Sequence, residues 1–315
     1  MLTPAELELF QHQGYLVLEN VIDPDTLAAI ISEYEELMDA LYADWALQGL
    51  VPAETPGMGF WDKLDIAYRG GFDWYQPLDI SLPHDGITTE TPMHFGPAVF
   101  AMATHPRILD IAESLIGPEL TSNPIQHVRI KPPERNVATD EIRAHIVSTD
   151  WHQDRGVTRE SADETRMVTV WLAITDATIE NGCLQVIPGK RDTMLPHCTL
   201  KQTGITDTHL PKDGAVPTPV KAGGAVIFDP LTPHASLPNV SDGYRWSFDL
   251  RYHVTGQASG REEFPSFVAR SRANPKTELK DWRVWKSMWE TARADVARQP
   301  HMPQHRWPSE GPFCA

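Results

Sequence analysis

The first part of the chain has the hydrophobic spacing of amphipathic helices. Thr3 caps a predicted helix that runs to about Gln13, and residues 14–18 read as a first strand. Asp23-Pro24 combines an N-cap acceptor with a residue whose φ is already set, which predicts the start of a second helix. Its apolar positions recur every three to four residues and predict one face packed on a core: Leu27, Ile30, Ile31, Tyr34, Leu37, Met38 and Leu41.

The pattern is less regular over the next segment. Residues 49–95 are rich in Gly, Pro and Trp without a clear period, so we expect loops that border an active site. A helix is expected from about Thr104 to Gly117. Another is expected over about 277–298, before a proline-rich tail.

From about residue 125 the pattern changes to short strands separated by Gly, Pro and Asn turns. The candidate strands are residues 125–131, 167–174, 183–187, 225–228 and 245–254. Many short strands with such turns favour a barrel or jelly roll. We expect a single domain over 1–315, with a mostly helical part at 1–124, a β core that holds the site at 125–255, and a C-terminal helix and tail at 256–315.

The last long strand alternates strictly between polar and apolar residues. Its polar positions are Arg245, Ser247, Asp249, Arg251 and His253, and the residues between them are Trp246, Phe248, Leu250 and Tyr252. Successive side chains of a strand point to opposite faces of its sheet. The polar face therefore lines a wet cavity or lies on the surface, and the alternation alone favours neither.

Composition and charge remove several classes of function. The chain has 315 residues, of which 41% are apolar, so it can bury a full core. Acidic residues number 43 against 27 basic ones, a net charge of −16 that repels phosphate backbones and anionic lipids. We therefore expect neither nucleic acid nor membrane as a partner.

The cysteines and the N-terminus bear on location. The three cysteines form no CxxC pair, so we expect neither a disulfide framework nor a thiolate zinc site. The N-terminus lacks the basic and apolar regions of a signal peptide. No apolar run is long enough for a transmembrane helix. These features predict a cytoplasmic protein.

The candidate chemistry lies at Trp151-His152-Gln153-Asp154. His152 and Asp154 are two residues apart, so on an extended chain they project to one side and can bind one metal together. A second histidine from a distant strand would complete a facial triad of two histidines and one carboxylate, with positions left open for co-substrate and oxygen. The chain has 13 histidines, so a chance HxD is a real alternative.

The downstream sequence settles that choice through a resemblance. His234 is followed by a serine, an Asn-x-Ser turn and then Arg245, eleven residues after the histidine. Together with His152-Gln153-Asp154 and the blocks at 170–172 and 180–189, this order resembles the phytanoyl-CoA dioxygenase family of iron(II)/2-oxoglutarate oxygenases. The resemblance covers about residues 125–255 and implies a mainly β fold with helical additions, built on a double-stranded β-helix (a cupin-like jelly roll).

The resemblance also implies roles for particular residues. His152, Asp154 and His234 would bind Fe(II), and Arg245 would hold the distal carboxylate of 2-oxoglutarate. A guanidinium fork suits that task because it gives two parallel hydrogen bonds to a carboxylate. The remaining positions in the family's co-substrate pocket are Ser236, Gln153 and Trp171. If residues 152–154 form a regular strand, however, Gln153 points away from the metal.

The implied reaction consumes O2 and 2-oxoglutarate, releases succinate and CO2, and hydroxylates an unactivated C–H bond of a small metabolite. Asp154 favours hydroxylation over halogenation, because halogenating relatives replace the carboxylate ligand with a small residue. Desaturation or cyclisation at the same centre remains an alternative. So does a cupin-like sensor that binds a metal without turnover.

Substrate contacts are less defined by the pattern. Basic residues lie near the metal motif in sequence, and together they indicate an anionic group on the substrate: His127, Arg129, Arg143, His145 and Arg155. Each of them is also a reasonable surface or structural residue. The sequence specifies neither the substrate nor the oligomeric state.

Overall fold

The N-terminal elements agree closely with the helical pattern of the sequence. The computed structural model describes residues 1–137, 141, 146–199, 202–299 and 306–307. Helix α1 (Pro4–Gln13) begins with a capping box in which Thr3 and Glu6 each bond the other's backbone N–H. Strand β1 (Tyr15–Leu18) follows, and then α2 (Pro24–Leu47), whose first turn is capped by the Asp23 carboxylate.

The segment 49–95 contains helical structure where we expected only loops. Helix α3 (Phe60–Arg69) starts where the Asp62 carboxylate accepts the N–H of Gly59 at 2.9 Å, and a short 3-10 turn, η1, covers Gln76–Leu78. The buried face of α3 consists of Phe60, Lys63, Leu64 and Ala67. This stripe is short and its flanks are rich in Gly and Pro, which concealed the period.

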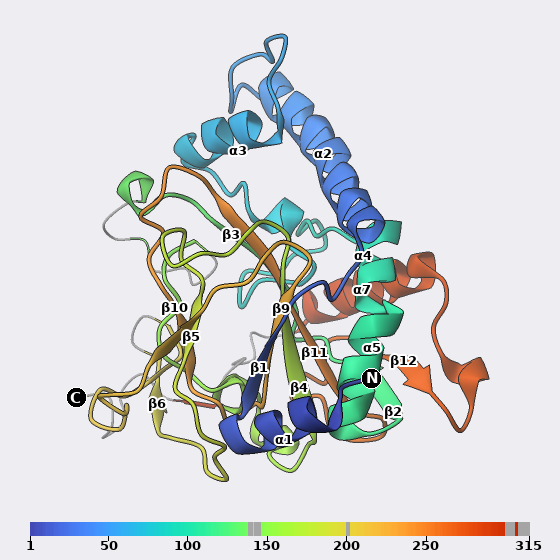
Figure 1. The fold of residues 1–315 in the computed structure, drawn as a ribbon. Helices are drawn as coiled ribbons and strands as arrows, with labels where there is room; N and C mark the ends of the chain where they lie inside the picture. Colours follow the sequence, from blue (N-terminus) through green and yellow to red (C-terminus); the bar gives the residue numbers. More distant parts are fainter. Residues whose placement is uncertain (138–140, 142–145, 200–201, 300–305, 308–315) are drawn as a thin grey trace.

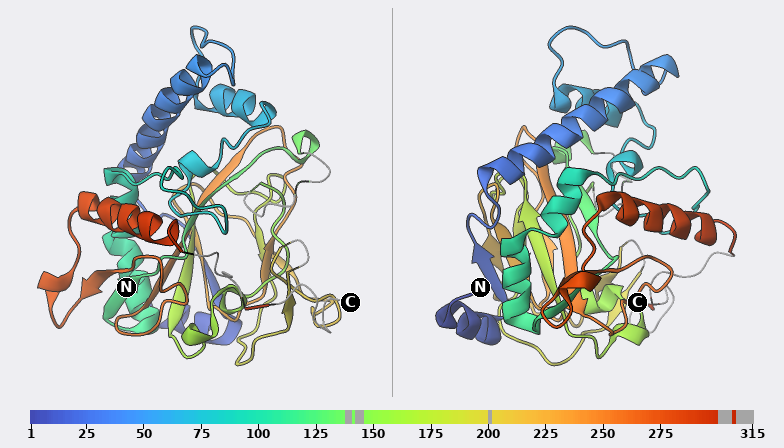
Figure 2. Two further views of the ribbon diagram at one scale, coloured as in Figure 1. Left: turned by 180° about the vertical axis from the view of Figure 1, so that it is seen from behind. Right: turned by 90° about the vertical axis from the view of Figure 1, so that its right-hand side faces the viewer.

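Further helices lie on one side of the large sheet, away from the strands β5 and β10, as Figures 1 and 2 show. Helix α4 (Pro97–Ala103), which the sequence pattern also missed, precedes α5 (Pro106–Ile116). The C-terminal helix α7 (Trp282–Val296) is shorter than expected and follows a 3-10 turn, η4, at Pro275–Thr277. Short turns complete the helical structure: η2 (Glu134–Asn136), α6 (Asp154–Val157) and η3 (Glu160–Ala162).

Two antiparallel sheets form the centre of the protein. The larger one has the order β1-β9-β4-β11-β2-β12, with β3 also paired to β11. Its other strands are β2 (Glu119–Ser122), β3 (His127–Lys131), β4 (Met167–Ala173), β9 (Ala225–Phe228), β11 (Arg245–Val254) and β12 (Phe267–Ser271). The smaller sheet consists of β10 (His234–Ser236), β5 (Leu184–Val186) and β8 (Val216–Thr218); β6 (His197–Cys198) pairs with β7 (Gly204–Ile205).

The helices cover the apolar face of β11. Trp246, Phe248, Leu250 and Tyr252 are all buried in the main core. The ring of Tyr34 from α2 lies 5.0 Å from that of Trp246, and the Tyr252 hydroxyl donates to the carbonyl of Ala103 at 2.7 Å. The outer face of the large sheet and the helices thus form one continuous core.

The opposite, polar face of β11 is also buried, which decides between the two interpretations of the alternation. Arg245, Ser247, Asp249, Arg251 and His253 are between 0% and 7% exposed. The polar face therefore points into the space between the sheets, because a surface strand would leave such side chains in water.

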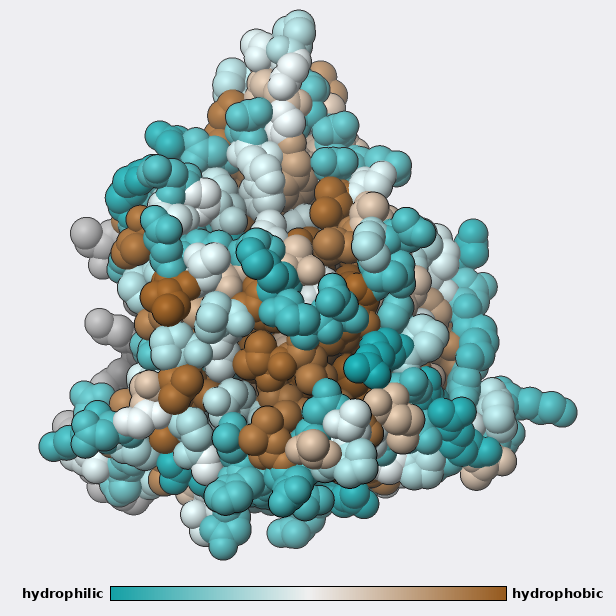
Figure 3. Space-filling view, viewed as in Figure 1, coloured by the Kyte–Doolittle hydropathy of each residue, from teal (hydrophilic) through white to brown (hydrophobic). Residues whose placement is uncertain are grey.

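Two further observations concern the surface and the cysteines. Figure 3 shows apolar side chains grouped in the middle of one face, around the edge strand β1, where Val17 is 38% exposed. Cys183 is a free, buried thiol. No helix in the described part of the chain is both long and apolar enough to cross a bilayer.

Helix α7 packs on the core through two buried tryptophans, Trp285 and Trp289, and the contribution of Trp285 can be tested. Trp285 is 1% exposed, and its ring lies 4.6 Å from that of Phe95 and 5.7 Å from that of Phe100. We expect Trp285→Ala to lower the free energy of unfolding by about 3–5 kcal/mol, since it leaves a cavity in the core. Chemical denaturation measures this. Val284→Ala, on the exposed side of the same helix, should change it by less than about 0.5 kcal/mol.

Candidate active site

Two histidines from distant parts of the chain are joined by backbone hydrogen bonds. His152 and His234 form an antiparallel bridge in which each N–H donates to the other's carbonyl oxygen at 2.9 Å. His234 begins β10, and His152 lies on the extended segment just before α6. The bridge sets the imidazole rings side by side, with centroids 4.1 Å apart.

The hydrogen bonds of the two imidazoles fix their tautomers. Nδ1 of His152 lies 2.8 Å from the carbonyl oxygen of Asp150, and Nδ1 of His234 lies 3.0 Å from that of Thr232. A carbonyl oxygen can only accept, so each Nδ1 carries the proton. Each Nε2 therefore presents a lone pair, which is the form that binds a metal.

The carboxylate of Asp154 completes the group. Its Oδ1 lies 3.8 Å from Nε2 of His152 and 3.9 Å from Nε2 of His234. The ligand atoms of the three residues all lie within 4.8 Å of one another, and all three side chains are buried. One metal ion can bind to all three, and the set of two imidazoles and one carboxylate fits non-haem iron.

The protonation states also suit a metal. Burial, and then the neighbouring His234, lower the pKa of His152 to about 3, and burial lowers the pKa of His234. Burial alone would raise the pKa of Asp154, but the charge of Arg251 and the other neighbours brings it well below the usual range. At neutral pH the site therefore offers two neutral imidazoles and an ionised carboxylate.

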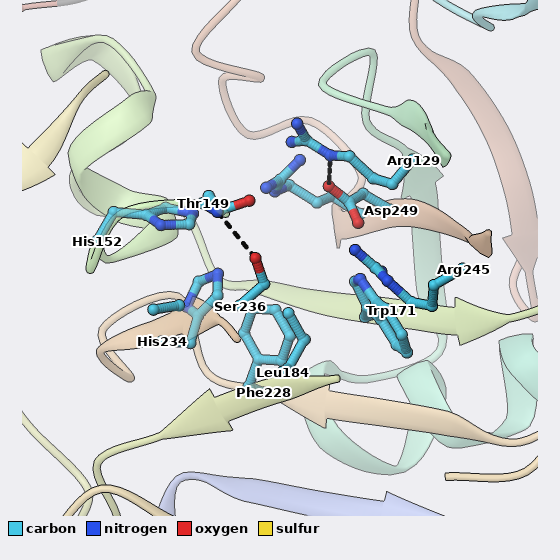
Figure 4. Close-up of a pocket in the computed structure, with 12 residues that line it drawn as sticks. Arg129, Thr149, His152, Trp171, Leu184, Phe228, His234, Ser236, Arg245 and Asp249 are labelled. Carbon is cyan, nitrogen blue, oxygen red and sulfur yellow. Dashed lines mark hydrogen bonds and ion pairs between the residues drawn. The ribbon is translucent and has the colours of Figure 1, made fainter. Parts of the chain in front are cut away.

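The histidines lie at one end of a cavity between the two sheets (Figure 4). The other lining residues come from both sheets and the segment before His152: Arg129, Thr149, Trp171, Leu184, Phe228, Ala235, Ser236, Arg245, Asp249 and Arg251. The free volume is about 20 Å³, room for about one water molecule.

Arg245 lies across the cavity from the histidines. Its guanidinium carbon is 5.0 Å from the centroid of the Trp171 ring, and Nη1 donates to Ser247 Oγ at 2.9 Å. The side chain is 1% exposed, its Nε has no hydrogen-bond partner, and it forms no ion pair with any described residue. Burial lowers the pKa of Arg245 to about 10, so it stays charged at neutral pH.

The other charged residues that line the cavity, and Lys131 next to it, already have ion-pair or hydrogen-bond partners. Arg129 donates from Nε to Asp249 at 2.8 Å, and Arg251 pairs with Asp154. Lys131, opposite Arg245 on β3, bonds Ser236 Oγ and the carbonyl of Val147. Burial and the charges of Arg245 and Arg129 lower its pKa well below the usual range. Arg245 is thus the cavity arginine that still lacks an anion.

Gln153 and Arg155, two of the expected site residues, are not among the residues that line the cavity. The Gln153 amide donates to the carbonyl of Leu231 at 2.6 Å, and its oxygen accepts from the N–H of Leu195 at 2.6 Å. Arg155 donates to the carbonyls of Ala162 and Thr165. Both side chains therefore hold the turn around Asp154 in place, and we no longer assign them to co-substrate or substrate.

The other residues that we expected to contact the substrate differ in where they lie. Arg129 lines the cavity, whereas the imidazole of His127 is bonded to the Asp79 carboxylate at 2.9 Å. Arg143 and His145 lie outside the described residues. Arg129 is therefore the one expected substrate contact that the structure places beside the histidines.

Sequence reasoning missed two residues that contact the metal ligands. Arg251 and Thr169 hydrogen-bond the carboxylate of Asp154. The sequence contains an indication of both residues. Arg251 shares the polar face of β11 with Arg245, and Thr169 lies two residues before Trp171 on β4. No local pattern, however, tells which buried polar residue meets which ligand.

Together these features define a mononuclear metal site with two imidazole ligands and one carboxylate, held between two antiparallel sheets. Comparison with known proteins shows the family to which the chain belongs. The family model described as phytanoyl-CoA dioxygenase (PhyH) matches residues 10–247, and the chain belongs to this family.

Individual relatives are distant. Phytanoyl-CoA dioxygenase domain-containing protein 1 of Danio rerio is 28% identical over 273 residues, which cover 78% of this chain and 88% of that protein. The non-heme monooxygenase ThoJ in its apo form superposes with a TM-score of 0.58 at 19% identity, over 92% of this chain and 98% of its own. The epimerase SnoN, in complex with Fe3+, alpha ketoglutarate and nogalamycin RO, has a TM-score of 0.53 at 20% identity, over 82% of this chain and 88% of its own.

Each of the three candidate ligands should be needed for metal binding. We expect His152→Ala, Asp154→Ala and His234→Ala to lose Fe(II) binding, measured by calorimetry under anaerobic conditions, while circular dichroism stays unchanged. The exposed His12→Ala should bind iron like the wild type. A ligand variant with wild-type affinity would remove that residue from the site.

Proposed function

We propose that this protein is an Fe(II)- and 2-oxoglutarate-dependent dioxygenase that hydroxylates an unactivated C–H bond of a small metabolite, with release of succinate and CO2. The observation that carries the proposal is that His152 and His234, which can bind one metal together with Asp154, line the same buried cavity as Arg245. Among the described residues, Arg245 has no ion-pair partner. The fold supports it too: sheets on both sides of the site and neighbours such as SnoN favour a single-domain double-stranded β-helix.

The protein's own residues would bind and orient the reactants. Bound iron, held by the three side chains, would supply the oxygen activation that couples decarboxylation of 2-oxoglutarate to C–H oxidation. The distal carboxylate of 2-oxoglutarate would form a bidentate pair with Arg245, because a buried guanidinium without an anion is costly until one binds. Trp171 would keep the guanidinium plane fixed, and Ser236 would contribute a hydroxyl.

The burial of this cavity suits the chemistry. His152, His234 and Arg245 are each less than 9% exposed, so bulk water is largely kept from the reacting centre. Arg129, which lines the same cavity, supports an anionic group on the substrate. SnoN, the named epimerase with bound Fe3+ and alpha ketoglutarate, supports the iron and co-substrate assignment by its fold, and ThoJ, named a monooxygenase, supports oxygen insertion.

Turnover of the co-substrate separates this proposal from a metal-binding sensor. Purified protein with Fe(II), 2-oxoglutarate and a metabolite library should consume oxygen and form succinate, with at least one metabolite accelerating both. A product heavier by one oxygen atom indicates hydroxylation, whereas loss of two hydrogens indicates desaturation or ring closure. Iron binding with no succinate under any condition would leave the sensor as the function.

The role of Arg245 can be tested separately from the metal. We expect Arg245→Ala to weaken 2-oxoglutarate binding by about 3–5 kcal/mol, roughly two to four powers of ten, while iron still binds. Arg245→Lys should recover only part of this, because an ammonium lacks the planar fork. Calorimetric titration of the metal-loaded protein with 2-oxoglutarate measures both effects.

The same titration checks the alternative anchors. If Arg245→Ala binds 2-oxoglutarate normally and Lys131→Ala does not, the co-substrate is oriented towards Lys131 instead. Arg251 is a weaker alternative, because its Nη1 and Nη2 already donate to Ile125 and Asp154.

A further inference from the structure

Both oxygens of the Asp154 carboxylate are held by side chains of the large sheet. Arg251 donates from Nη2 to Oδ1, and the hydroxyl of Thr169 donates to Oδ2. Asp154 is completely buried, so water does not compete for these contacts. The carboxylate therefore has one fixed orientation.

The two donors are themselves rigidly placed. Arg251 on β11 and Thr169 on β4 are direct partners across the antiparallel pair. Arg251 also donates from Nη1 to the carbonyl of Ile125 at 2.8 Å, and it is 4% exposed. Arg251 and Thr169 therefore hold the carboxylate from two fixed positions on neighbouring strands.

These two hydrogen bonds give the two oxygens of Asp154 different surroundings. Oδ1 faces Nε2 of both histidines, at 3.8 and 3.9 Å, whereas Oδ2 bonds Thr169. A carboxylate oxygen has two lone-pair directions, so Oδ1 can accept from Arg251 and still bind a metal. To bind the same metal, Oδ2 would have to turn from Thr169 towards the histidines, and the hydrogen bond from Thr169 opposes that turn.

We propose that Arg251 and Thr169 are positioning residues that restrict Asp154 to binding the metal through one oxygen. The consequence concerns the number of coordination positions that would stay open on a bound metal. With three protein ligand atoms, an octahedral metal keeps three positions free, two for a chelating 2-oxo acid and one for oxygen. A carboxylate bound through both oxygens would take one of these, and the chelated co-substrate would leave none for oxygen.

This inference rests on the proposed function, and it can be tested with the metal alone. Co(II) serves as the probe, because its visible absorption weakens as coordination number rises and its affinity is measured by calorimetry. Thr169→Val keeps the shape of the side chain but removes the donor to Oδ2. Arg251→Met removes the donor to Oδ1 with similar bulk.

We expect both variants to bind Co(II) about 10–100-fold more weakly than the wild type, the usual effect of removing a partner of a metal ligand. The Co(II) spectrum of Thr169→Val should also shift towards higher coordination number, because Oδ2 is then free to bind. A merely structural role for Thr169 would leave this spectrum unchanged.

Arg270→Met is the matched control. Arg270 is also a buried arginine of the large sheet, paired with Asp110 and Glu113 and remote from the cavity. Its loss should leave Co(II) affinity within about twofold of the wild type. An equal loss of affinity in Arg270→Met would show that general destabilisation is the cause and overturn the inference.

The remaining outcomes distinguish the inference from the proposed function. Wild-type affinity and spectrum in both Thr169→Val and Arg251→Met would reject the positioning role while leaving the metal site intact. Absence of Co(II) and Fe(II) binding in the wild type would instead reject the metal site, and the proposed function with it.

Discussion

The central constraint of this structure is that the charged residues of one strand are buried between two sheets. An uncompensated charge in such an environment is costly, so each must find an opposite charge or a set of hydrogen bonds. Asp249 pairs with Arg129, and Arg251 pairs with the metal ligand Asp154. These pairings fix β3, β11 and the turn at Asp154 relative to one another. Arg245 has no ion-pair partner among the described residues, which is why we propose it as the residue that binds an anionic co-substrate.

The parts of the fold that the sequence predicted are those with long, regular periods. Helix α2 and strand β11 each present a continuous pattern, and both form where expected. Helix α3 was missed because its buried face is only four residues, between segments rich in Gly and Pro. Strand β10 has three residues, too few to show an alternation, so its place beside β5 follows only from the assembled sheet.

The site could be predicted in the same uneven way. His152 and Asp154 follow from their spacing, but His234 required the pattern of a whole family, because nothing local relates residues so far apart in the chain. The side chains of Gln153 and Arg155 lie outside the cavity, because Gln153 donates to the carbonyl of Leu231 and Arg155 to that of Thr165, contacts that only the folded chain reveals. The contact between Arg251 and Asp154 depends on the register of β11 against β4, which no single segment encodes.

The backbone bridge between His152 and His234 has a consequence for how the protein is made. The metal site consists of two halves that come together only when β10 has paired with the segment around His152, a contact between segments widely separated in sequence. Such contacts form late, because closing a long loop costs entropy before any contact is gained. An ion therefore meets all three ligands only in a chain whose strands have already paired, so metal binding is expected to follow folding and to stabilise the folded state.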